Sequence, residues 1–426
     1  MFLSDDEKRL LNGEEGFVRQ RCMEYLVELA TVSGAEKMVD LDGTADFHVP
    51  TTAMVPEYVF PFEELKKIVD EGAVFKIPTY ANKAPFYGAT FIDGWECCDY
   101  PPHNDPKHHK DAMYEEWMNL YIKMGLIATY SCASYLAASY WPSIGQHCAW
   151  NESSAVPYCN AVLGGRSNID GSFASAFLGK APYVGMHVPE RRLATVVIDT
   201  ERRIASDIEW DVFGFAVGEE CGLDVPALIN TSKPTTTQYQ KFNTASNTGG
   251  SIAMYHIPGS TPEAPTLDFA LGGKNPQRSV CFDEAHLKKT YEKLNDHRGD
   301  TVEMVSLGCP HYNLVDLMLL ARKLEGKKVK IPMWIMTVPT LYQTVEQLGY
   351  KKIFDDAGAK LLSGTCPGAI GGLPGGVRAL AVDAAKQAYY ISGLFPEADD
   401  HLDVFFGTQD DCIDAALTGK WHGEWR

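Results

Sequence analysis

Short apolar runs alternate along the chain with longer stretches in which apolar residues recur at helical spacing. Apolar positions between residues 10 and 29 follow that spacing and predict a helix near the N-terminus. Helical patterns also occupy 285–296 and 313–326. Strands that alternate with helices predict α/β layers with mostly parallel sheets. The runs that predict strands are 71–80, 124–132, 181–190, 193–200, 249–259, 301–311, 329–337 and 357–366.

The length of the chain predicts more than one domain. At about 150 residues per domain, 426 residues correspond to two or three domains. The polar segment 95–111 predicts a long exposed loop, and the segment 272–279 predicts a linker. We expect an N-terminal α/β region in 1–125, a central α/β domain in 126–300 and a C-terminal α/β domain in 301–426.

Composition and charge exclude several classes of function. Hydrophobic residues make up 45% of the chain and charged residues 22%, which is typical of a folded globular protein. The net charge of −18 argues against binding to nucleic acid or to an anionic membrane. No apolar run approaches the ~18 residues of a transmembrane helix. The acidic N-terminus lacks the features of a secretory signal, so we expect a cytoplasmic protein.

Three of the 11 cysteines follow directly after predicted strands: Cys132, Cys309 and Cys366. Ligands bind outside the carboxyl ends of strands in open α/β sheets, so three thiols could meet there. Cys309 also precedes a predicted helix, where a thiol ionises more easily. Three thiolates without a fourth predict an iron–sulfur cluster with one open iron, or a metal with a vacant position. The alternative is that all three are buried packing thiols.

Polar residues in 151–168 surround an apolar helical middle. Glu152 is a candidate acid–base group, and Arg166 could hold a carboxylate or phosphate through two hydrogen bonds. The alternative is a helix capped by Ser153 or Ser154, which the residues alone favour. Lys386 follows a predicted strand and begins a predicted helix, where it would contact an anion or remain solvated.

Other candidate sites are weaker. Adjacent cysteines rarely ligate one zinc ion, and the spacing in the 95–111 loop is irregular. We therefore do not predict a metal site there, although the loop holds Cys97, Cys98, His103, His108 and His109. The glycine-rich stretch 363–376 offers backbone N–H groups to an anion or a cluster sulfide, and it lacks a nucleotide-binding signature.

Taken together, these segments resemble the large component of the aconitase X family, a branch of the aconitase superfamily of hydro-lyases. The matching motifs run in order over nearly the whole chain: LNGEEG (11–16), DFHVP (46–50), ESSAV (152–156), GSTPEAPT (259–266), GCPH (308–311), SGTC (363–366) and AAKQAYY (384–390). The resemblance implies an aconitase-like fold of several α/β/α layered domains. It also implies an iron–sulfur-dependent dehydratase in which Cys132, Cys309 and Cys366 hold the cluster.

The same resemblance implies a partner. Family members have a small swivelling domain, which is either fused at the N-terminus or made as a separate subunit. No part of this sequence matches that domain, so we expect a separate small swivelling-domain subunit. The expected substrate is a small hydroxy acid, with cis-3-hydroxy-L-proline preferred because basic residues are scarce near the motifs. Mevalonate 5-phosphate or another hydroxy acid is the alternative.

The motifs depart from the family pattern at several positions. The family's Thr-Cys-Thr-Pro-Tyr, Gly-Ala-Arg-Thr-Asn and Asp-Thr-Cys are Ser-Cys-Ala-Ser-Tyr at 131–135, Gly-Gly-Arg-Ser-Asn at 164–168 and Gly-Thr-Cys at 364–366. A serine and a histidine of the family are replaced by Ala384 and Tyr389. Because the three cysteines and Arg166 are retained, we expect a changed substrate rather than a lost cluster.

We expect catalytic roles for Glu152, Ser153 and Lys386, and substrate contacts from Arg166, Asn168, His187 and Ser154. Lys386 and Arg166 would hold the developing anion. Two other classes stay open: a cluster-bearing regulator, and a catalytically silent assembly partner.

Overall fold

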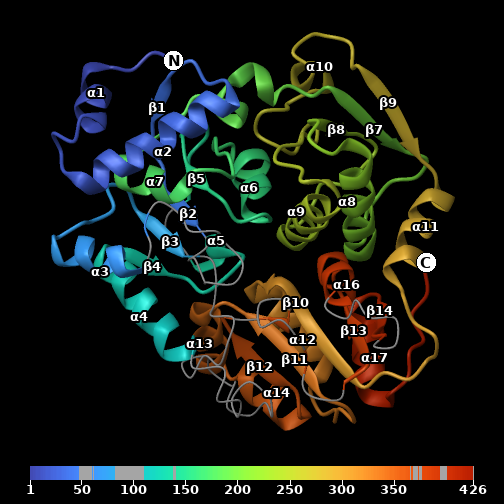
Figure 1. Ribbon diagram of the computed structural model, residues 1–426. Helices are drawn as coiled ribbons and strands as arrows, with labels where there is room; N and C mark the ends of the chain where they lie inside the picture. The colour runs from blue at the N-terminus through green and yellow to red at the C-terminus, as the bar shows by residue number, and fades with distance from the viewer. Residues whose placement is uncertain are drawn as a thin grey trace.

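The computed structural model describes residues 1–47, 60, 62–81, 110–137, 141–364, 366–367, 373, 377–393 and 401–425. The candidate metal residues of the 95–111 loop lie outside this part of the chain. Figure 1 shows three regions of α/β layers arranged around a middle to which α5, α6 and α9 belong. The larger sheets are parallel throughout, as predicted. Within the described ranges, no helix has the length and apolar character needed to cross a membrane.

The first region contains a four-stranded parallel sheet in the order β4-β3-β2-β5. The predicted N-terminal helix is wrong in one respect, because the chain forms two helices there. Gly13 and Gly16 have positive φ and turn the chain between the two helices. The elements are α1 (Asp5–Leu11), α2 (Phe17–Ser33), β1 (Met38–Asp40), β2 (Ala45–Phe47), α3 (Phe62–Asp70), β3 (Thr79–Ala81), α4 (Lys110–Lys123), β4 (Leu126–Ala128), α5 (Ser134–Ala137), β5 (Ala149–Trp150), α6 (Ala155–Pro157), a π-helix (Tyr158–Leu163), α7 (Ser172–Leu178), β6 (Lys180–Pro182) and 3-10 turns at Gly185–His187 and Pro189–Arg192.

The second region contains a three-stranded parallel sheet in the order β8-β7-β9. The predicted strand at 249–259 is wrong: Gly249 and Gly250 complete helix α9, and His256 joins the sheet only through a single bridge to Ala227. The elements are β7 (Val196–Thr200), α8 (Asp207–Cys221), β8 (Pro226–Leu228), α9 (Thr236–Gly250), α10 (Leu267–Ala270), β9 (Arg278–Phe282) and α11 (Glu284–Leu294).

Helices α8 and α9 pack backbone against backbone through glycines. A Cβ added to Gly218 would lie 2.4 Å from the carbonyl oxygen of Ser246, and one added to Gly250 would lie 1.7 Å from that of Gly218. Only hydrogen fits at these positions, so the close approach explains why the glycine pair at 249–250 belongs to a helix.

The third region contains a five-stranded parallel sheet in the order β12-β11-β10-β13-β14. Most residues of its strands are buried, as expected for a parallel sheet covered on both faces. The elements are β10 (Met304–Tyr312), α12 (Leu314–Leu324), β11 (Met333–Thr337), α13 (Pro339–Gln347), α14 (Tyr350–Ala357), β12 (Lys360–Ser363), β13 (Ala379–Val382), α16 (Ala385–Ser392), β14 (Asp403–Phe406) and α17 (Gln409–Thr418).

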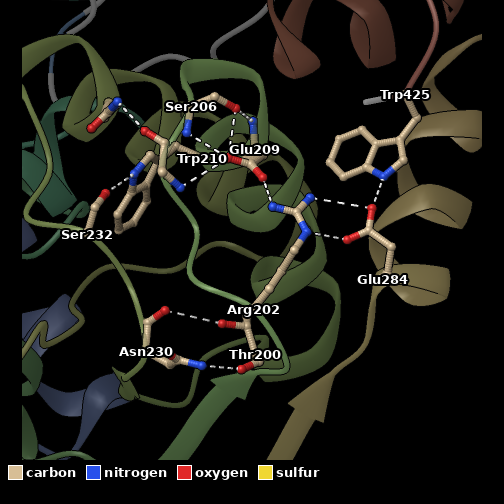
Figure 2. Close-up of polar contacts among 11 residues, drawn as sticks. Thr200, Arg202, Ser206, Glu209, Trp210, Asn230, Ser232, Glu284 and Trp425 are labelled. Atoms are coloured by element: carbon tan, nitrogen blue, oxygen red, sulfur yellow. Dashed lines mark hydrogen bonds and ion pairs between the residues drawn. The ribbon is translucent and has the colours of Figure 1, made fainter.

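The chain beyond α17 returns to the second region. Figure 2 shows the indole N–H of Trp425 donating to Glu284, which also pairs with Arg202. Arg202 pairs in turn with Glu209 of α8. The ring of Trp425 lies 5.5 Å from that of Tyr291, centroid to centroid. These contacts attach the C-terminal segment to α11 and α8.

The three regions meet through a few elements. Helix α9 contacts α6, β10 and α16, and α13 contacts α5. Residues from all three regions are therefore held close to the carboxyl ends of β4, β10 and β12.

The glycine contact between α8 and α9 predicts the effect of a single added methyl group. Gly218→Ala should lower the free energy of unfolding by about 2 kcal/mol or more, because the backbones must separate. Gly299→Ala, where the added Cβ meets no atom within 4 Å, should change it by less than about 0.5 kcal/mol. Urea denaturation of both variants measures this, and equal small effects would contradict the packing.

Candidate active site

The three cysteines predicted at strand ends lie near one another. Cys132 follows β4, Cys309 lies in β10 and Cys366 follows β12. Electrostatic interactions join the thiol of Cys132 to that of Cys366, and the thiol of Cys309 to both of the others. Two loops and a strand from different parts of the sequence therefore bring the sulfur atoms near one another.

Contacts between the loops hold this arrangement. The hydroxyl of Ser131 and Nδ1 of His311 are hydrogen-bonded at 2.9 Å, and both residues are buried. The backbone N–H of His311 also donates to the sulfur of Cys132. On the third loop, a Cβ added to Gly364 would lie 3.1 Å from that of Tyr130. The loop after β4 is thus packed against the other two.

A bulge in β10 brings Cys309 out of regular pairing. Leu307 pairs with Ile335, but the next pair is Tyr312 with Thr337, so four residues of β10 face one of β11. Gly308 begins the bulge with a φ of 95°, and a Cβ there would lie 2.3 Å from the carbonyl oxygen of Met336. The prediction that Cys309 lies past the strand end is therefore wrong, because the strand continues to Tyr312.

The expectation that Cys309 ionises easily is also wrong. Burial raises the pKa of its thiol well above the ordinary value, and Cys366 and Cys132 raise it further, while Lys386 lowers it. Burial likewise raises the pKa of Cys132 to about 12. Helix α12 begins only at Leu314, where the side chain of Asn313 already accepts from its first N–H groups. These thiols would lose their protons as a metal binds.

Glu152, Ser153 and Lys386 form one hydrogen-bonded group. The ammonium of Lys386 donates to the hydroxyl of Ser153 at 2.8 Å, and that hydroxyl donates to Oε1 of Glu152 at 3.1 Å. Nζ of Lys386 lies 3.7 Å from the same carboxylate oxygen. The three residues for which we predicted catalytic roles are therefore in contact, although 233 positions separate Ser153 from Lys386.

The second oxygen of Glu152 is fixed by the start of α6. Oε2 accepts from the backbone N–H groups of Ser154 at 2.6 Å and Ala155 at 3.0 Å, and from the hydroxyl of Ser154 at 2.5 Å. Ser154 precedes the helix as a cap would, but its hydroxyl bonds Glu152 and caps no helical N–H. These donors stabilise the negative charge of the buried carboxylate.

Lys386 keeps its positive charge. Burial alone would lower the pKa of its ammonium, but Glu152 raises it, followed by Cys309 and Cys132, and the net effect is a raised pKa. The site therefore combines a fixed cation with three thiols, and thiolates formed there would be stabilised by it.

Arg166, Asn168 and His187 form a second group. Nε of Arg166 is buried and has no hydrogen-bond partner among the described residues. Asn168 accepts from the N–H of Met186 and donates to the carbonyl of Val184, so it holds the turn that carries His187. This arrangement leaves the guanidinium of Arg166 with unused donor capacity.

Two histidines lie beside Arg166. Nδ1 of His187 and Nδ1 of His147 are 2.9 Å apart, so one ring donates and the other accepts. Burial lowers the pKa of His187 to about 3, with His147 and Arg192 adding to the effect. His147 was not predicted from the sequence. The structure places it at the site through a backbone bridge that pairs it with Arg166.

Asp46 is a buried carboxyl that sequence reasoning missed, although it begins the DFHVP motif. Oδ2 accepts from the hydroxyl of Ser134 at 2.5 Å, and Oδ1 has no partner within the described part of the chain. Burial raises its pKa to about 8; the Ser134 hydrogen bond opposes this rise and the charge of Glu152 adds to it. Asp46 therefore holds its proton more strongly than an ordinary carboxyl, and it lies near Glu152.

The three thiols are soft donors, which are typical of iron–sulfur clusters. In the described ranges, no group of three or more His, Cys, Asp or Glu side chains is close enough to hold one metal ion. A small cavity beside Cys309 is lined also by Gln240, Lys241, His311 and Tyr312. The set of three thiols fits an iron–sulfur cluster.

Comparison with known proteins identifies the family. Models of the first, second and third domains of aconitase X match residues 1–190, 194–292 and 302–418. The chain belongs to the aconitase X family. It is similar to the crystal structure of Thermococcus kodakaraensis aconitase X (holo-form), with a TM-score of 0.76 and 30% identity over 92% of this chain and 95% of that one.

Two named relatives show the range of activities in the aconitase X family. The phosphomevalonate dehydratase large subunit of Thermococcus kodakarensis is 30% identical over 92% of this chain and 95% of its own length. The cis-3-hydroxy-L-proline dehydratase of Hypocrea jecorina is 28% identical over 98% of this chain and 69% of its own length. Both are dehydratases, and this chain is a hydro-lyase of the same family.

The raised pKa of Asp46 predicts a pH-dependent stability. Between about pH 4 and pH 8 the folded protein keeps a proton that the unfolded chain has released, so the contribution of Asp46 falls as the pH rises through that window. Asp46→Asn keeps an acceptor for Ser134 but cannot ionise. The variant should therefore lose less stability than the wild type between pH 5.5 and pH 8. Urea unfolding at both values measures this, and parallel changes would contradict the assignment.

Proposed function

We propose that this chain is the large subunit of an iron–sulfur-dependent dehydratase that acts on a small hydroxy acid. The observation that carries the proposal is the meeting of three thiols beside the ammonium of Lys386. Membership of the aconitase X family adds the reaction class. Neither a regulator nor a silent assembly partner would require the Lys386–Ser153–Glu152 group to be built next to the thiols.

Cys132, Cys309 and Cys366 would hold the cluster in this proposal. When bound, a cluster with three protein ligands supplies an open iron that can polarise the substrate hydroxyl as a Lewis acid. The bulge at Gly308 and the N–H of His311 keep the ligands in place. The positive charge of Lys386 offsets part of the negative charge of the thiolates.

The chain's own residues would manage charge and protons. Lys386 stays an ammonium, so it would stabilise negative charge that develops on the substrate and would not act as a base. Ser153 lies between Lys386 and Glu152, and its hydroxyl can pass a proton to the carboxylate. We therefore assign Glu152 as the acid–base group of this subunit and Ser153 as its relay.

Arg166 is the proposed contact for the substrate carboxylate. A planar guanidinium matches a carboxylate through two parallel hydrogen bonds, and its unpaired Nε is available for one of them. Asn168 and His187 would support this side of the substrate site, through the turn at 184–186 and the pair with His147. Ser154 would contribute by fixing Glu152.

The balance of charge favours cis-3-hydroxy-L-proline as the substrate. A phosphate would require several free cations, but Lys180 is paired with Glu7 at 3.2 Å and with Asp40. Arg192 is likewise paired with Glu263 at 2.6 Å. Mevalonate 5-phosphate remains a second candidate, because several relatives are named phosphomevalonate dehydratase large subunit.

A separate small subunit is part of the proposal. Relatives that this chain matches over most of their length are named large subunits, which implies a partner for those proteins. We propose that this chain also requires a small swivelling-domain subunit, and that it is inactive alone.

The cluster assignment predicts a colour change in three variants. Protein purified without oxygen should be brown and contain iron and sulfide, and Cys132→Ser, Cys309→Ser and Cys366→Ser should each bleach it. Cys22→Ser and Cys281→Ser are the controls, since one thiol is buried in a different core and the other is exposed. Iron, sulfide and visible absorption measure the outcome. Full retention of the cluster in the three variants would reject the ligands.

The role of Arg166 predicts the effect of a conservative change. Arg166→Lys should lower kcat/KM roughly tenfold to a hundredfold, because a bidentate charged contact is lost. Arg191→Lys, at an exposed arginine, should have little effect. The assay reconstitutes the two subunits and follows loss of the hydroxyl from each candidate acid. Dehydration of mevalonate 5-phosphate alone would overturn the preferred substrate, and dehydration of neither would indicate a third hydroxy acid.

A further inference from the structure

We infer that Asp211 is a positioning residue for Lys386, and that Lys241 and Asp383 hold its carboxylate in place. This inference rests on the proposed role of Lys386 in catalysis. Asp211 lies in α8 and Lys241 in α9, whereas Asp383 directly precedes α16. The second region of the molecule would thus set the position of a catalytic side chain in the third.

The contact between Asp211 and α16 is direct. Oδ2 of Asp211 accepts from the N–H of Ala385, the first residue of the helix, at 3.1 Å. Ala384 occupies the capping position and has no side-chain oxygen for this purpose. The side chain of Asp211 from α8 therefore supplies the acceptor at the N-terminus of the helix.

Lys241 fixes the carboxylate of Asp211. Its ammonium lies 3.4 Å from Oδ2 of Asp211 and 3.5 Å from Oδ2 of Asp383, and it also donates to the carbonyl of Asp383. Tyr312 donates to Oδ2 of Asp383 at 2.5 Å. Asp211 is 1% exposed, Asp383 2% and Lys241 9%, so these contacts are made with little help from water. Burial raises the pKa of Asp211 to about 7, and Lys241 and the N–H of Ala385 oppose that rise.

The backbone of Lys386 is held on both sides by these contacts. Ala385 is bonded to Asp211, and the side chain of Gln387 donates to Ser306 of β10 at 2.8 Å. Lys386 then needs only its own side chain to reach Ser153. A small displacement of the start of α16 would lengthen that 2.8 Å contact and misplace the ammonium.

A matched pair of aspartates separates positioning from general stability. Asp316 is also buried and raises the pKa of Lys241, but its own hydrogen bonds go to Thr237 and Asn313 and not to α16. Asp211→Ala in the reconstituted, cluster-loaded enzyme should lower kcat about tenfold or more with a smaller change in KM. Asp211→Asn keeps an acceptor for Ala385 and should lose less. Asp316→Asn should stay within about twofold of the wild type.

Two further readouts make the test decisive. In the Lys386→Ala background, Asp211→Ala should cause no additional loss of turnover, because it acts through Lys386. Crystal structures of the variants should show the contact between Lys386 and Ser153 lost in Asp211→Ala and kept in Asp316→Asn. Additive losses, an intact contact in Asp211→Ala, or equal effects of Asp211→Ala and Asp316→Asn on kcat would overturn the inference. An inactive wild type would reject the proposed function instead, and the crystallographic comparison would still test the positioning.

Discussion

The hydrogen bond between Ser131 and His311 joins the loop after β4 to the bulge of β10, and the candidate site depends on this junction. Ser131 follows β4 of one sheet beside Cys132, and His311 lies in β10 of another sheet beside Cys309. The N–H of His311 adds a second link, directly to the sulfur of Cys132. Without these contacts, nothing would hold the segments of Cys132 and Cys309 together. Cluster binding would then have to order both segments, at a cost in conformational entropy.

Charge is balanced around the same junction. Glu152 and Lys386 are both shielded from water, and each compensates the other, while Ser153 links them. Asp211, Lys241 and Asp383 form a second buried group next to the start of α16. Removing one member of such a group leaves a buried charge without a partner, which is far more costly than losing an exposed ion pair. The Lys386–Ser153–Glu152 group is therefore backed by a second buried polar group, which contacts α16 through Ala385.

The sequence predicted the parts of the site that depend on local pattern. Apolar runs located β4, β10, β11 and β12, and therefore placed the three cysteines near strand ends. It failed where the outcome depends on contacts between distant residues. The glycine pair at 249–250 reads as the start of a strand, but packing against Gly218 makes it part of α9. The raised pKa of Asp46 could not be predicted from the sequence, because it results from burial and from Glu152, which is distant in the sequence. The ease of ionisation expected for Cys309 was wrong, because burial outweighs the effect of a helix that begins only at Leu314.

The most direct measurement is anomalous diffraction at the iron absorption edge, from crystals of the chain grown without oxygen. Iron should lie in contact with the sulfur atoms of Cys132, Cys309 and Cys366, with Lys386 and Glu152 adjacent. Iron bound at other side chains, or bound with one of these cysteines turned away, would contradict it.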